Sequence, residues 1–198
     1  MARIEPLARE DLPQHEDAFV LVEQLMGFVP NSMFTMAKVP GLFEGFRGLA
    51  MTVMGQSQIP SELVQMVAQV TSNAAGCRYC QAHTGHAAHH QGVPEEKLAE
   101  LWTFETSEHF SDAERAALRL ALHAGQVPNA TTEEDFAECR KHFDEGEILS
   151  IVATISLFGF LNRWNDTMAT ELEETPSAFG AKVLTDSGWE AGKHAAAE

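Results

Sequence analysis

The longest apolar stretch of the chain constrains its fold most. Residues 148–161 read ILSIVATISLFGFL, and helical spacing continues on both sides, so the sequence predicts one long helix over residues 145–171. A helix that is apolar on nearly every side needs burial on nearly every side, either at the centre of a core or in a subunit interface. The apolar run is too short to cross a membrane and contains three hydroxyl side chains, so we expect a buried helix.

The rest of the chain also has helical apolar spacing, whereas alternating strand patterns are scarce. Proline, glycine and capping residues mark the helix ends. The expected helices cover residues 16–28, 32–38, 41–54, 61–75, 77–91, 95–104 and 112–124, with another starting near residue 131. We therefore predict an all-α, single-domain helical bundle over residues 1–175, followed by an irregular C-terminal tail over residues 176–198.

Charge and size limit the classes of function. The chain has 13 Lys and Arg residues against 29 Asp and Glu residues, a formal net charge of −16, which repels nucleic acid and anionic membranes. No apolar run follows the charged N-terminal residues, so we expect a cytoplasmic protein. A chain of 198 residues can bury a sufficient core without disulfides, and its few cysteines call for a chemical explanation.

Two of the three cysteines, Cys77 and Cys80, are spaced i and i+3 at the predicted start of a helix. That spacing places both thiols on one face, close enough to form a disulfide after modest adjustment. The helix N-terminus carries a partial positive charge, which favours thiolate over thiol. A redox-active pair is the favoured interpretation, and two buried apolar cysteines are the alternative.

A proton relay is predicted beside the pair. His83 lies one turn after Cys80 and is suited to accept the thiol proton, and His86 is a second candidate one turn further along. On the preceding helix, Glu62 and Gln65 are spaced i and i+3, and either side chain is suited to orient the imidazole.

The segment GCRYCQAHT at residues 76–84, with GVPEE at residues 92–96, resembles the carboxymuconolactone decarboxylase family in its alkyl hydroperoxidase D-like branch. The segment FLNRWND at residues 160–166 resembles the peroxidase-related members of that branch. The resemblance covers roughly residues 30–175. It implies an all-α fold, assembly as a homo-oligomer and a thiol peroxidase cycle without metal, haem or other cofactor.

The resemblance also implies site roles. Cys80 would attack the hydroperoxide, and Cys77 would resolve the sulfenic acid to a disulfide that an external dithiol reduces. The hydroperoxidase of the family has a histidine where this chain has Thr84 and a glutamate where it has Gln65, so His83 and Glu62 are the nearest equivalents. The expected catalytic residues are thus Cys80, Cys77, His83 and Glu62.

Three alternatives accompany this expectation. A zinc site of Cys77, Cys80, His83 and His86 is disfavoured because one straight helix cannot wrap four ligands around a metal. A decarboxylase acting on a lactone acid would not need the cysteine pair, and a non-catalytic redox sensor would use the disulfide only to change its assembly.

Near the end of the long helix, Asp166 is expected to pair with Arg163.

Overall fold

The computed structural model describes residues 2–196, and every regular element among them is helical. The predicted all-α class is confirmed. The α-helices are α1 (Glu16–Met26), α2 (Asn31–Met36), α3 (Leu42–Gly55), α4 (Ser61–Ala75), α5 (Arg78–His90), α6 (Glu95–Ala99), α7 (Asp112–Ala124), α8 (Glu133–Cys139), α9 (Glu145–Met168) and α10 (Glu174–Val183). Short 3-10 turns are η1 (Arg9–Asp11), η2 (Pro13–His15), η3 (Leu101–Thr103), η4 (Thr185–Ser187) and η5 (Gly192–His194).

Local capping signals fix most helix boundaries. Helix α7 begins after Ser111, whose hydroxyl accepts the N–H of Glu114 while the Glu114 carboxylate accepts the N–H of Ser111. The same reciprocal arrangement starts α8 and α9. Gly76 adopts a left-handed conformation with φ of 75° and turns the chain from α4 into α5. These short-range effects explain why the predicted helix over residues 112–124 matches α7 at both ends.

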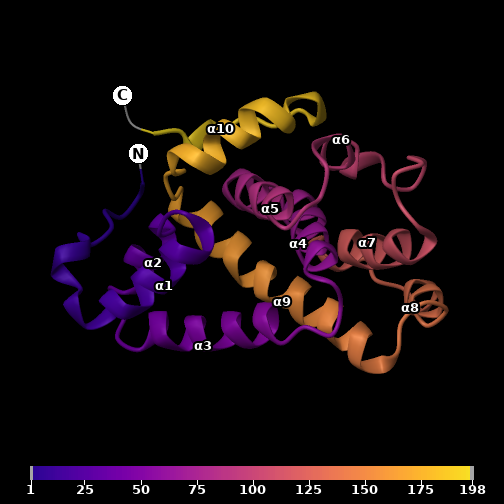
Figure 1. Cartoon of the computed structure of the whole chain (residues 1–198), viewed down its shortest axis with the longest axis horizontal. Helices are drawn as coiled ribbons and strands as arrows, with labels where there is room; N and C mark the ends of the chain where they lie inside the picture. Colours follow the sequence, from indigo (N-terminus) through magenta and orange to yellow (C-terminus); the bar gives the residue numbers. More distant parts are fainter. Residues whose placement is uncertain (1, 197–198) are drawn as a thin grey trace.

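Helix α9 crosses the molecule diagonally and packs against α3, α4, α5 and α7 (Figure 1). By length and composition alone, α9 is apolar enough to cross a membrane. Within the described residues, 39% of its most apolar 18-residue segment is buried. Leu149 and Phe160 remain 66% and 37% exposed. The expectation of burial on every side is therefore met on one side only.

The C-terminal segment corrects the sequence prediction. Residues 176–196 are not an irregular tail, since they contain most of α10 and the turns η4 and η5, and α10 lies over α5 (Figure 1). Phe179, Val183 and Trp189 are buried there. The Trp189 ring packs directly over Gly180, which has no Cβ to obstruct it. Contacts with a helix about 100 positions earlier therefore order a segment with little periodicity of its own.

Candidate active site

The two cysteines lie where α4 ends and α5 begins. Cys77 is the N-cap residue of α5, and its Sγ accepts a hydrogen bond from the Cys80 backbone N–H at 3.5 Å. Both side chains are free thiols and are buried, with exposed fractions of 0% and 3%. The sequence prediction that these thiols share the start of one helix is confirmed. Since Cys77 caps the helix, its sulfur lies at the positive end of the α5 dipole.

The surroundings of the two sulfurs differ. Burial raises the pKa of Cys80 well above its ordinary value, and the neighbouring Cys77 raises it further. Asn165 of α9 opposes this effect by donating a hydrogen bond from Nδ2 to the Cys80 Sγ at 3.6 Å. Cys80 thus differs from Cys77 in its contact with α9.

His83 belongs to a second cluster, which is built around Glu173. The His83 Nε2 lies 2.6 Å from the Glu173 carboxylate, and the Tyr79 hydroxyl donates to the same carboxylate at 2.9 Å. The rings of Tyr79 and His83 are stacked with centroids 4.2 Å apart. Burial alone would raise the pKa of Glu173, but the His83 charge and the hydrogen bonds lower it instead. The sequence gives no local signal for Glu173, since it meets His83 only through tertiary packing.

The structure does not bring Glu62 to the cysteines. Its side chain is exposed in the first turn of α4 and hydrogen-bonds with Ser61. Cys77 follows the opposite end of that 15-residue helix, about 20 Å away at 1.5 Å per residue. The partner of His83 is Glu173, so a carboxylate is present as expected but comes from the α9–α10 junction.

His86, the second histidine considered for the relay, faces aromatic side chains. Its ring centroid lies 6.2 Å from that of Phe28 and 5.9 Å from that of Phe179. Burial lowers the pKa of His86, and the neighbouring histidines lower it further. Among the described residues, Cys77 is grouped with Asp166 and His194 and not with His83 or His86, so the four residues of the zinc alternative do not meet at one point.

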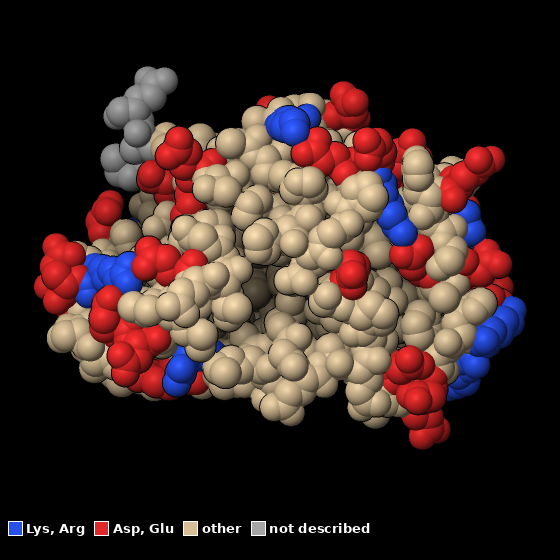
Figure 2. Space-filling view, viewed as in Figure 1, with Lys and Arg blue, Asp and Glu red and all other residues tan. Residues whose placement is uncertain are grey.

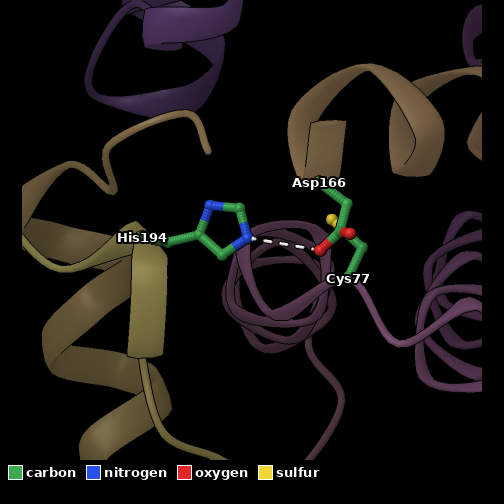
Figure 3. Close-up of side chains that lie close together, drawn as sticks. All are labelled: Cys77, Asp166 and His194. Carbon is green, nitrogen blue, oxygen red and sulfur yellow. Dashed lines mark ion pairs between the residues drawn. The ribbon is translucent and has the colours of Figure 1, made fainter. Parts of the chain in front are cut away.

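A third cluster joins Cys77 to Asp166 and His194 (Figure 3). The Cys77 Sγ, the Asp166 carboxylate and a His194 ring nitrogen lie within 4.8 Å of one another. Asp166 pairs with Lys193 at 2.8 Å, and not with Arg163 as expected from the sequence. That ammonium group already supplies a positive charge to the Asp166 carboxylate.

A cavity lies beside the two histidine clusters. The cavity has a volume of about 300 Å³ and is lined in part by Asn31 and Thr170. The Asn31 N–H donates to Glu173, and the Thr170 carbonyl accepts from His194, so the cavity adjoins both clusters. Figure 2 shows a hollow near the middle of the visible face, and most charged side chains on this face lie toward its edge.

A model of the carboxymuconolactone decarboxylase family matches residues 40–123, which include α4 and α5. The chain is 27% identical over 112 residues to the uncharacterized protein YdfG of Bacillus subtilis (strain 168), a match that covers 56% of this chain and 74% of the relative.

Solved structures extend the similarity to nearly the whole chain. The apo debrominase Bmp8 is 38% identical with a TM-score of 0.84, over 90% of this chain and 96% of Bmp8. A cysteine-to-alanine variant of Bmp8 in complex with 2,3,4-tribromopyrrole is 37% identical with a TM-score of 0.86, over 91% of this chain and 97% of that one. An uncharacterized peroxidase-related protein of Ralstonia eutropha JMP134, with an alkylhydroperoxidase AhpD core, has a TM-score of 0.79 at 23% identity, over 88% and 94% of the two chains. At that identity the last likeness concerns the fold alone.

Proposed function

Because the chain belongs to the carboxymuconolactone decarboxylase family and has the alkyl hydroperoxidase D-like fold, we propose that it is an oxidoreductase whose Cys77 and Cys80 thiols reduce a hydroperoxide. One observation carries this proposal. The two sulfurs are held on the first turn of α5, where the Cys77 Sγ accepts the Cys80 N–H. Neither thiol forms a disulfide with Cys139, so both are in the reduced state that the reaction requires.

The reaction balances with these two thiols alone. One thiolate attacks the distal oxygen of the hydroperoxide, the O–O bond breaks, and the alkoxide takes up a proton. The attacking cysteine is then a sulfenic acid, and the second thiol displaces water from it to form the Cys77–Cys80 disulfide. The protein loses two electrons and the hydroperoxide becomes an alcohol and water. An external dithiol then restores both thiols by exchange.

A second candidate reaction is the reductive debromination of an aromatic halide. The identity of 37–38% with the debrominase Bmp8, over nine-tenths of the chain, favours it. The same dithiol suffices: a thiolate takes bromine from carbon, the carbanion takes up a proton, and the other thiol releases bromide as the disulfide forms. Aromatic rings lie beside α5 and are suited to stack on a flat substrate. One of them is the Phe28 ring, whose centroid lies 5.3 Å from that of the His83 ring.

One experiment tests both reactions. Reduced protein is mixed with one equivalent of cumene hydroperoxide, or with brominated pyrroles that include 2,3,4-tribromopyrrole, and alcohol or bromide is measured together with remaining thiols. We expect two thiols to be lost for each product molecule and turnover to require added dithiol. Product formation that survives replacement of both Cys77 and Cys80 by serine would contradict the proposal, and lactone decarboxylation by that double variant would favour the decarboxylase.

Oxidation without turnover is the outcome expected of a redox sensor. Cys77 and Cys80 would then form a disulfide once, and added dithiol would restore them without sustained consumption of substrate. A change of assembly state on oxidation, measured by sedimentation, identifies that case.

We also propose that the protein is a homo-oligomer. Exposed apolar side chains gather on α3 and α9, which contact each other. Leu49 and Met51 are 52% and 54% exposed on α3, and Leu149 is 66% exposed on α9. Exposed apolar side chains on two helices that contact each other favour a subunit interface there. It also accounts for the apolar side of α9 that the single chain leaves uncovered.

A further inference from the structure

His194 is fully buried and is held in one orientation. Its Nδ1 lies 2.7 Å from the Thr170 carbonyl oxygen, and a carbonyl only accepts hydrogen bonds. The proton of the neutral ring is therefore on Nδ1, and Nε2 carries a lone pair. Among residues 2–196, this buried Nε2 has no hydrogen-bond partner. Such an unsatisfied acceptor in the interior calls for a functional explanation.

Figure 3 shows a His194 ring nitrogen directed toward the Asp166 carboxylate, with the Cys77 side chain beside that carboxylate. The Asp166 Oδ1 is 3.7 Å from the Nε2, and the Cys77 Sγ belongs to the same cluster of atoms within 4.8 Å. An ionised carboxylate cannot donate a proton, whereas a thiol can. Of the two side chains that share this cluster with His194, only Cys77 has a proton to donate, and Asp166 lies where it can stabilise an imidazolium.

The charges around the cluster agree with this direction of transfer. Burial lowers the pKa of His194, which favours the neutral base, although the Thr170 bond and Asp166 act in the opposite direction. Lys193 of η5 also lowers it and is itself paired with Asp166. From α5, Cys80 and Tyr79 face the same region, and both have raised pKa values because they are buried. Glu173 reaches the region only through Tyr79.

From this geometry we infer that His194 is the proton acceptor for Cys77, so Cys77 attacks the substrate and Cys80 closes the disulfide. The inference rests on the proposed dithiol chemistry and reverses the order that the family resemblance implies. The Cys77 proton moves to the His194 Nε2 as the sulfur attacks, and the imidazolium returns it to the alkoxide, or to the carbanion in debromination. Cys80 then displaces water or bromide, and the electron count of the overall reaction is unchanged.

The test measures sulfur reactivity without either proposed substrate. Variants that retain only Cys77 (Cys80→Ser, Cys139→Ser) or only Cys80 (Cys77→Ser, Cys139→Ser) are treated with methyl methanethiosulfonate, a small uncharged thiol reagent, between pH 5 and pH 10. We expect Cys77 to react at lower pH than Cys80. A lower midpoint for Cys80 would overturn the inference.

His194→Asn in the Cys77-only protein removes Nε2, while the asparagine amide keeps a donor near the position of Nδ1. We expect the rate at pH 7 to fall by about 10-fold or more, because the proton acceptor is lost. His90→Asn, at an exposed position near the end of α5, is the matched control and should leave the rate unchanged. An unchanged rate in His194→Asn would overturn the inference.

If His194→Asn does not fold, His194→Gln places a non-titrating amide near Nε2 instead, and the comparison of the two single-cysteine proteins still decides the order of attack. Failure of the proposed function is a separate result. In that case neither hydroperoxide nor bromopyrrole would be turned over, whatever the pH dependence of Cys77.

Discussion

The Glu173 cluster supports the most detailed prediction about stability. This carboxylate is 11% exposed and accepts hydrogen bonds from the Asn31 N–H, the Tyr79 hydroxyl and the His83 Nε2. It joins α2 and α5 to the segment that enters α10. Removing it leaves three donors buried without their acceptor, and loosens the segment that carries His194.

These contacts set the expected loss of stability when Glu173 is replaced. Glu173→Gln keeps the size and one acceptor oxygen but loses the charge, so we expect a loss of about 2 kcal/mol in the free energy of unfolding. In a domain of this size, that loss lowers the melting temperature by about 4–8 °C. Glu173→Ala also removes both oxygens, and a broken buried pair costs about 3–5 kcal/mol.

The contribution of Glu173 to the free energy of unfolding depends on pH. The pKa of Glu173 is lowered in the folded protein from its ordinary value of 4.5, so its stabilisation is fully present above pH 4.5 and is lost as the pH falls through the folded value. Urea unfolding of wild type and Glu173→Gln at pH 7 and at pH 3 measures this. We expect the difference in free energy to shrink at pH 3. A difference that is constant with pH, or below about 0.5 kcal/mol at pH 7, would refute the reasoning.

Three further predictions concern other parts of the chain. In Gly180→Ala the new Cβ would lie 2.7 Å from the Trp189 ring, so we expect a loss of about 1–3 kcal/mol in urea unfolding, and an unchanged midpoint would contradict this packing. Leu149→Glu should dissociate the proposed oligomer in sedimentation experiments while leaving the helical circular dichroism intact; an unchanged sedimentation coefficient would place the interface elsewhere. Burial raises the pKa of Cys139 to about 11, and nearby carboxylates contribute to the rise. This thiol should therefore resist alkylation in the folded protein at pH 8. Rapid labelling would show that it is not buried.

Much of the fold is predictable because helix boundaries depend on nearby residues. Caps such as Ser111 and breaks such as Gly76 act within one turn of the chain, and the predicted boundaries agree with α7 and with the start of α5. The pairing of Cys77 and Cys80 on one helical turn is local in the same way.

The missed parts of the site depend on distant contacts. Glu173 meets His83 across 90 positions, and no spacing rule connects residues so far apart. For Glu62, a helical wheel gives the direction of the side chain around α4 but not its position along the helix axis. The length of α4 separates Glu62 from the cysteines. His194 lies in a segment whose order comes from packing against α5, so its sequence resembles that of a frayed end.

The most direct test of the central claim is the rate at which one equivalent of cumene hydroperoxide oxidises the reduced protein, followed by peptide mapping. We expect a disulfide between Cys77 and Cys80, formed about 100-fold or more faster in the folded protein than in the urea-unfolded chain at the same pH. Cys139 should remain a free thiol. Equal rates in folded and unfolded protein, or a folded protein whose two thiols persist, would contradict the account.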